Sequence, residues 1–193
     1  MGGGYGSNAL VFLIQTLFSL YLIAIMLRFL LQLTRADFYN PMSQFLVKVT
    51  NPPLVPLRRL IPGVMGIDVA AIVLMVVIQA LEQFLVYIVQ GFTLAPLGLL
   101  VLTLAELLKL LFNVYFFTIL VQVVLSWVSP GAYNPTVALL YSLNEPLLRR
   151  ARRIIPPIHG VDLSPIVVII GLQLLTFLLI QPIQDLGRTL AAG

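Results

Sequence analysis

Ionisable groups inside apolar runs are the first residues in this chain that could do chemistry. Glu82 lies about 14 residues into one apolar run, roughly 21 Å from its start at 1.5 Å per residue. Asn113 reaches a similar depth in the next run, and Lys109 lies about one turn further out. An ionisable group at that depth costs at least ~2.5–3.5 kcal/mol unless it is paired or hydrated. The sequence therefore predicts either a structural contact of Glu82 with Lys109 or Asn113, or a polar pathway.

Two arginine pairs form a second candidate site. Arg58-Arg59 and Arg152-Arg153 each precede an Ile-Pro turn, which would hold two guanidinium groups at headgroup depth. Anionic phospholipid is the natural ligand, because a basic side chain near an anionic leaflet contributes roughly 1 kcal/mol and Arg can bind phosphate through two hydrogen bonds. The alternative is that these arginines only set the membrane topology.

Asp68 and Asp162 stand immediately before apolar runs, so either could cap a helix, an interaction worth about 1 kcal/mol. Each could also form a salt bridge back to its arginine pair, and the two interactions are compatible. Gln79 and Gln173 lie near the middle of the expected spans, where glutamine side chains usually hydrogen-bond between helices.

Several kinds of chemistry are not expected. The chain has no cysteine, which excludes disulfides, thiolate catalysis and zinc–sulfur sites. His159 is the sole histidine, so a metal or acid–base role is not expected, and we expect no cofactor and no enzymatic activity. The formal charge of +4 comes from basic residues clustered beside apolar spans, so a membrane surface is a simpler partner than nucleic acid.

The arginine pairs belong to a tandem repeat of the whole chain. The differences 152 − 58, 156 − 62 and 162 − 68 all equal 94, which relates Arg, Pro and Asp positions without a gap. The same offset relates Tyr39-Asn40-Pro41 to 133–135 and Gln79 to Gln173, whereas it relates Glu82 to Thr176. We expect two repeats, residues 1–96 and 97–193.

The composition indicates an integral membrane protein. Hydrophobic residues make up 60% of the chain and charged residues 9%, against about 25% charged in soluble proteins. Four apolar runs can cross the bilayer, at 10–33, 69–89, 97–128 and 164–182. The predicted fold is all-α, with four transmembrane helices as two tandem parallel repeats, each with a short interfacial amphipathic helix in its cytoplasmic loop. In the first span we expect Arg28 to extend its guanidinium to the headgroups.

The two loop helices are predicted at 42–49 and 136–143. Asn-Pro opens each one, with Asn as the cap and Pro in the first turn. In the first helix, Met42, Phe45, Leu46 and Val49 form an apolar stripe while Ser43, Gln44 and Lys48 face elsewhere; in the second, Leu139, Leu140 and Leu143 form the stripe. Asn51-Pro52-Pro53 and Glu145-Pro146 are expected to end these helices.

The basic loops predict the orientation. Lys and Arg concentrate between spans one and two and between spans three and four, which places both loops in the cytoplasm and both termini outside. Because each repeat has an even number of spans, the repeats should be parallel. A bacterial plasma (inner) membrane is the expected location.

The repeated motif resembles the YggT family of small bacterial membrane proteins, which has plastid relatives. The resemblance is carried by 37–41, by Pro-Leu-Arg-Arg-Leu-Ile-Pro at 56–62, by Gly66-Ile67-Asp68, and by their second copies, and it covers nearly the whole chain. It implies an inner-membrane location. Bacterial members are associated with tolerance of osmotic shock and potassium homeostasis, and plastid members with cofactor assembly and with division or nucleoid-related roles. The family implies no catalytic residues.

Two functions are expected from these observations. The first is a non-enzymatic plasma-membrane protein that supports osmotic-stress tolerance and potassium homeostasis, with its arginine loops contacting anionic lipid. The second is a membrane scaffold or assembly factor that recruits partners for cofactor maturation or cell division. The expected partners are the lipid bilayer and anionic phospholipid, with a homo-oligomer or other membrane proteins as further candidates.

Overall fold

The computed structural model describes residues 4–128, 134–157 and 162–191, and almost all of this part of the chain is helical. One isolated β-bridge, Val64 to Ile67, closes the turn after α2. In chain order the helices are α1 (Tyr5–Leu33), α2 (Pro41–Leu60), α3 (Val69–Gln90), α4 (Pro96–Val128), α5 (Pro135–Ile154), α6 (Ser164–Leu175), the π-helical segment η1 (Thr176–Ile180) and α7 (Gln181–Ala191).

Four of these helical segments are long and apolar enough to cross a membrane. They are α1, α3, α4 and the continuous segment from α6 through η1 to α7. Because a span needs about 20 apolar residues, each of the four has the necessary length. The four predicted spans are confirmed, and the chain is a multi-pass membrane protein.

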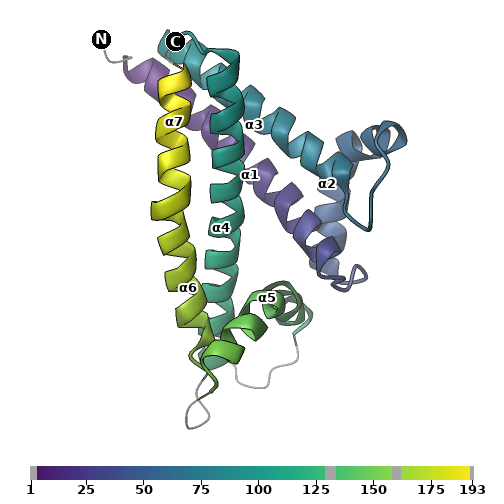
Figure 1. Cartoon of the computed structure of the whole chain (residues 1–193). Coiled ribbons are helices and arrows are strands. Elements are labelled where there is room, and N and C mark those ends of the chain that lie inside the picture. The colour runs from purple at the N-terminus through teal and green to yellow at the C-terminus, as the bar shows by residue number, and fades with distance from the viewer. Residues whose placement is uncertain (1–3, 129–133, 158–161, 192–193) are drawn as a thin grey trace.

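The spans form two packed pairs that diverge. α1 packs against α3, and α4 packs against α6, η1 and α7. Figure 1 shows both termini and the α3–α4 connection at one end of the molecule, with the pairs separating toward α2 and α5. α4 joins the two pairs, since it contacts α1 and α3 as well as the helices of its own repeat.

Small residues let α4 and α7 approach closely. A Cβ added at Gly98 would overlap the backbone of Ala191, and one at Gly187 would meet the side chain of Leu102 at 2.8 Å. Small residues at such crossings are typical of membrane helices, whose association depends on close van der Waals packing. This contact holds α7 against the first turns of α4.

The π-helical segment η1 changes the face that the last span presents to the protein. From Leu172 onward, the buried residues of this span are Leu172 and Ile180, followed after η1 by Gln184, Gly187 and Ala191. A π-helical turn holds an extra residue, so the register after it is rotated relative to an unbroken α-helix. α3, the equivalent helix of the first repeat, is continuous.

The loop helices begin as predicted. The side chain of Asn40 accepts a hydrogen bond from Met42 N at 3.0 Å, and that of Asn134 accepts one from Thr136 N at 2.9 Å. Both helices open with a proline, whose missing N–H is no loss in the first turn.

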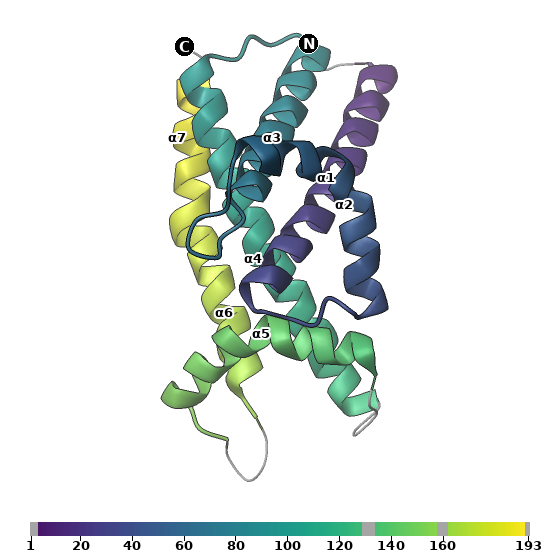
Figure 2. The same ribbon diagram turned by 90° about the vertical axis from the view of Figure 1, so that its right-hand side faces the viewer.

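The prediction that prolines end these helices was wrong. α2 continues through Pro52, Pro53 and Pro56, and α5 continues through Pro146. A proline removes one backbone hydrogen bond and bends a helix, and Figure 2 shows α2 changing direction along its length. Consequently both arginine pairs lie in the last turn of a helix.

Apart from Leu46, the apolar stripe predicted for α2 does not pack against the rest of the protein. The buried face of this helix consists of Ser43, Leu46, Thr50 and Leu54, while Met42, Phe45 and Val49 are exposed. In α5, by contrast, the predicted Leu139 and Leu143 are buried. The buried face of α2 includes polar residues because it meets a polar side chain of α1, described below.

Candidate functional site

A polar cavity lies among the membrane-spanning helices, between α1, α3 and α4. It has a volume of about 220 Å³, and its polar lining consists of Ser19, Gln79, Glu82, Glu106, Lys109 and Asn113. A second cavity of about 280 Å³ shares four of these residues and extends to Gln15, Gln83, Tyr87 and Arg188. The cavities are therefore two sections of one polar region.

Glu82 is held by a residue of its own helix. Gln79 Nε2 donates to Glu82 Oε2 at 3.2 Å, and both side chains are buried. Among the described residues, no salt bridge or hydrogen bond joins Glu82 to Lys109 or Asn113, although all three line the same cavity. The expected direct contacts are therefore replaced by a shared cavity.

Glu106 is the second carboxylate of this region. Lys109 Nζ lies 3.5 Å from Glu106 Oε2, and Gln184 Nε2 of α7 donates to Glu106 Oε1 at 2.7 Å. Glu106 and Gln184 are not among the site residues that the sequence predicted. The i, i+3 spacing of Glu106 and Lys109 could have indicated their pairing.

Gln173 does not join this site. It is half-buried on α6 and lines neither of the two cavities around Glu82. The structure therefore brings together Gln79, Glu82, Lys109 and Asn113, and places the fifth predicted intramembrane residue elsewhere.

In the first repeat, the aspartate before α3 both caps that helix and binds an arginine. Arg58 donates through Nε to Asp68 Oδ2 at 3.2 Å, and its Nη2 contacts the same oxygen. The other oxygen, Asp68 Oδ1, accepts from Ala71 N at 3.2 Å. This carboxylate ties the end of α2 to the start of α3.

The second repeat contains the equivalent link. Arg152 Nε donates to Asp162 Oδ2 at 2.9 Å, and its Nη1 reaches both carboxylate oxygens of Glu145 at 3.1 Å. Asp162 Oδ1 accepts from Ser164 N at 2.9 Å. Partial burial alone would raise the pKa of Asp162, but the hydrogen bonds from Ser164 and Arg152 outweigh it and lower that pKa.

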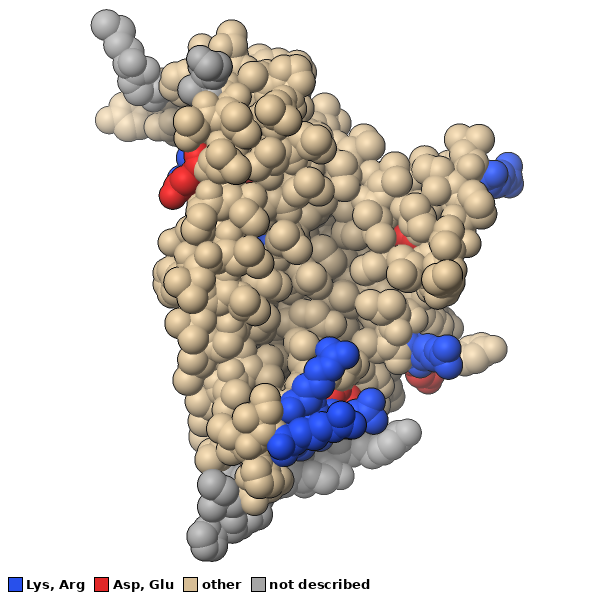
Figure 3. Space-filling view, viewed as in Figure 1, with Lys and Arg blue, Asp and Glu red and all other residues tan. Residues whose placement is uncertain are grey.

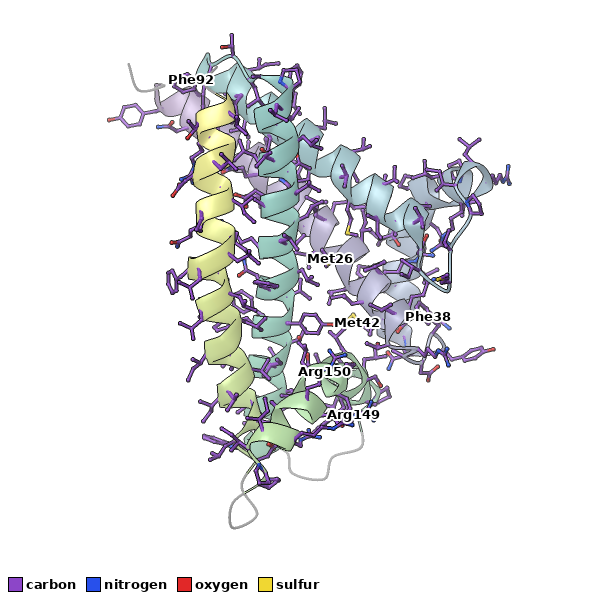
Figure 4. All side chains as sticks on the ribbon, in the orientation of Figure 1. Met26, Phe38, Met42, Phe92, Arg149 and Arg150 are labelled. Atoms are coloured by element: carbon purple, nitrogen blue, oxygen red, sulfur yellow. The ribbon has the colours of Figure 1, made fainter. Side chains whose placement is uncertain are left out.

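The second arginine of each pair is free to face outward. Arg59 and Arg153 are exposed, as are Arg149 and Arg150. Figure 3 shows basic side chains gathered over α5, and Figure 4 labels Arg149 and Arg150 on that helix. Each predicted arginine pair thus contains one residue bound to a carboxylate and one at the surface.

A buried arginine joins α1 to α2. Arg28 Nη1 donates to Thr50 Oγ1 at 2.6 Å and to the backbone oxygen of Val47 at 3.5 Å. The prediction that Arg28 extends to the headgroups was wrong, because its side chain is buried against α2. In the second repeat the equivalent residues are Gln122 and Asn144, and Asn144 Nδ2 donates to Gln122 Oε1 at 2.8 Å.

Part of the repeated motif cannot be compared. Tyr133, His159, Gly160 and Val161 lie outside the described residues. Within the described ranges, no three His, Asp or Glu side chains come together as a metal site would require.

Known proteins similar to this chain show its family. A model of the CCB3/YggT family matches residues 7–89 and 101–183, two copies that are 94 positions apart (101 − 7). The chain is 44% identical over 177 residues to an uncharacterised protein of Pseudomonas aeruginosa, covering 91% of this chain and 90% of that one. It is 36% identical over 190 residues to the uncharacterised protein YggT of Escherichia coli K12, covering 96% and 97% of the two chains. No solved structure matches significantly. Its two repeats and these relatives show that the chain belongs to the CCB3/YggT family.

Proposed function

We propose that this protein is a non-enzymatic component of the bacterial plasma membrane that supports osmotic-stress tolerance and potassium homeostasis. The polar cavity around Glu82 is the observation that carries the proposal. Buried ionisable groups within membrane spans are costly and commonly mark ion or proton pathways. Side chains from α1, α3, α4 and α7 line this one region.

The charges around the cavity favour a cation. When both carboxyl groups are ionised, Glu82 and Glu106 oppose a single positive charge on Lys109. Arg188 also lines the second cavity, but it pairs with Asp185 at 3.0 Å, so these two charges offset each other. The region then has one negative charge in excess, which a proton or a monovalent cation would neutralise.

The exposed arginines support a contact with anionic lipid at the proposed cytoplasmic face. In this proposal Arg59 and Arg153 reach lipid phosphates, while Arg58 and Arg152 hold the loops in place through their aspartates. Basic residues on the cytoplasmic side would leave both termini outside. A topology reporter fused to the C-terminus and one inserted near Ala95 should both report the external side. A cytoplasmic signal from either would contradict this orientation.

The proposed function is tested by genetic rescue. A strain lacking its YggT-type gene is complemented with the wild-type chain, with Glu82→Gln, or with Asp37→Asn as a matched control. Asp37 is suitable because it lies in the α1–α2 loop, where it accepts a hydrogen bond from Tyr39 N. We expect Glu82→Gln to lose rescue under potassium limitation and hyperosmotic shock at equal protein level, while the control retains it. Full rescue by Glu82→Gln would contradict the proposal.

A scaffold or assembly factor is the second candidate. The exposed apolar side chains of Met42, Phe45 and Val49 on α2 favour it, because they could contact another membrane protein. Rescue by Glu82→Gln together with loss of rescue in a Phe45→Ser, Val49→Ser variant of unchanged abundance would favour this function over ion transport.

A further inference from the structure

We propose that the cavity around Glu82 is one section of a hydrated track that winds around α4 and is closed in this structure by Asn144 of α5. The claim that the track carries a cation rests on the proposed function. The track itself, its course and its closure rest on the arrangement of cavities and hydrogen bonds, and they can be tested without measuring transport.

The first three cavities are joined through shared lining residues. The two sections around Glu82 share Gln79, Glu106 and Lys109. A third cavity, of about 440 Å³, shares Ser19, Leu110 and Asn113 with the 220 Å³ section and extends along α4 to Thr118, and the rest of its lining, Ile23, Leu27, Val114 and Phe117, is apolar. Side chains of α4 therefore line a continuous series of cavities from Glu106 to Thr118.

A fourth cavity lies beyond Thr118. It has a volume of about 540 Å³ and is lined by Gln122 and Ser126 of α4 together with Arg152 and Asp162. It lies beside the ion pair that connects α5 to the start of α6. The third and fourth cavities thus approach the same turn of α4 from opposite ends of the molecule.

Three hydrogen-bonded side chains separate these two cavities. Thr118 Oγ1 donates to Asn144 Oδ1 at 2.9 Å, and Asn144 Nδ2 donates to Gln122 Oε1 at 2.8 Å. Asn144 and Gln122 are buried. Thr118 belongs to the third cavity and Gln122 to the fourth, so Asn144 bridges the ends of both and acts as the closure.

The proposal places water in the part of the track lined by Glu106, Lys109 and Asn113. The side chains of Lys109 and Glu106 are 42% and 33% exposed, and Asn113 is also exposed, although all three lie within a membrane-spanning helix. Hydrocarbon cannot satisfy such groups, so they require water or a partner. A water molecule occupies about 30 Å³ in the liquid, so each of the two polar sections around Glu82 has room for several.

In this proposal the closure opens when α5 is displaced from α4. Thr118 and Gln122 are fixed on α4, whereas Asn144 comes from α5, which is not a membrane span. Withdrawal of α5 would remove Asn144 and leave two polar α4 side chains lining the gap. The cavities on either side would then be continuous.

The absence of cysteine from the chain allows a direct test by thiol labelling. Single cysteines are introduced in proteoliposomes as Asn113→Cys, Thr118→Cys, Gln122→Cys, Ser126→Cys and Leu120→Cys. The probe is a small cationic methanethiosulfonate added to one side of the membrane at a time. Leu120 is the control: it lies between Thr118 and Gln122 in sequence, is exposed, and points about 200° away from Gln122 around the helix.

We expect Asn113→Cys and Ser126→Cys to react from opposite sides, and Thr118→Cys to react slowly with probe added from the Ser126 side. Adding Asn144→Ala should speed the reaction of Thr118→Cys from that side by about tenfold or more, because the hydrogen bond from Asn144 to Gln122, which Thr118→Cys leaves in place, is then lost. Gln122→Ala removes the same hydrogen bond from the α4 side and should act in the same direction, so the result does not depend on the folding of the Asn144→Ala variant alone. Leu120→Cys should stay unreactive in every background.

Two results would overturn the track: unchanged reactivity of Thr118→Cys in both opened backgrounds, or equal reactivity of Leu120→Cys. Potassium and proton fluxes in the same liposomes test the proposed function separately and distinguish the two cations. Labelling as expected without either flux would refute the cation function and retain the track. Flux that depends on Glu82 with unchanged labelling would retain the function and refute the track.

Discussion

The two repeats make the same connection between a span and its loop helix with different chemistry. In the first repeat Arg28 of α1 binds Thr50 of α2; in the second, Gln122 of α4 binds Asn144 of α5. Both residues of each pair are related by the offset of 94 positions. The comparison shows that the fold places a buried polar contact at this point, while a charged or a neutral donor can supply it.

The difference has an energetic consequence. The guanidinium of Arg28 is buried, no carboxylate within the described residues forms a salt bridge with it, and its Nε atom has no hydrogen-bond partner. A buried charge that loses a partner is destabilising by more than a neutral amide is. The first repeat should therefore be the more sensitive of the two to loss of this contact.

The largest expected effect comes from removing the partner of Arg28. Thr50→Val keeps the side-chain shape but deletes the hydroxyl acceptor, and it should lower the unfolding free energy by about 3 kcal/mol. Asn144→Leu in the second repeat should lower it by about 1–2 kcal/mol, because only neutral hydrogen bonds are lost. Thermal unfolding in one detergent compares the two variants. Equal losses of stability would show that the charge of Arg28 does not increase the cost of removing its partner. The double variant Arg28→Gln, Thr50→Asn transfers the second pair into the first repeat and should be more stable than Thr50→Val alone.

A pair of equivalent glycines should give the next largest difference. A Cβ at Gly98 would overlap Ala191, whereas Gly4, 94 positions earlier, has open space around it. Gly98→Ala should therefore separate α4 from α7 and lower stability by about 1–3 kcal/mol, the usual range for overpacking. Gly4→Ala should leave the melting temperature unchanged. A tolerated Gly98→Ala would mean that the α4–α7 contact can shift without loss.

The two aspartate links should differ by less. The side chain of Asp68 is 5% exposed and that of Asp162 is 37% exposed, although each binds an arginine and accepts a hydrogen bond from a backbone N–H at the start of a helix. Asp68→Ala should lower the unfolding free energy by about 2 kcal/mol, since a buried charge-assisted hydrogen bond and a cap are lost together. Solvent screens the ion pair of Asp162, so Asp162→Ala should cost less than about 1 kcal/mol. A larger loss for Asp162→Ala would reverse this ranking of the repeats.

The smallest expected effect on stability concerns the outer arginines. Arg59→Gln with Arg153→Gln should leave the melting temperature within about 1 °C, because exposed charges away from ion pairs contribute little. The same variant should retain less anionic lipid in native mass spectrometry than the wild type. Arg58→Gln with Arg152→Gln is the matched control, which should unfold more easily yet keep its bound lipid. Equal lipid retention in all three proteins would mean that the arginines serve topology and structure alone.

The loop helices show where equivalence between the repeats ends. Phe45 of α2 is 58% exposed, whereas its equivalent in α5, Leu139, is 5% exposed. Leu139 and Leu143 join the same hydrophobic core as residues of α1, so α5 packs across the boundary between the repeats. The Nδ2 atom of Asn40 also donates to the backbone oxygen of Pro135 at 2.7 Å across this boundary. Met42, Phe45 and Val49 of α2 have no such neighbour and are exposed, so the two equivalent loop helices bury different faces.

Features that depend on local chemistry or on spacing along the chain were predictable from the residues alone. Apolar runs of sufficient length predicted the four spans, and the ungapped offset predicted the repeat. Asn-Pro predicted both helix starts, because capping involves residues two or three positions apart. The Asp that follows each arginine pair in the sequence suggested a salt bridge, and each repeat contains one.

The polar groups that meet inside the membrane spans depend on how the helices pack, and they could not be predicted from the sequence. Gln184 reaches Glu106 because η1 lies before α7 and α7 packs closely on α4, and neither condition can be read from the residues near Glu106. Arg28 lies against Thr50 because α2 folds back and packs on α1. The physical reason is the same in both cases: hydropathy predicts that a helix enters the membrane, but its rotation about its own axis is set by packing against neighbours distant in sequence.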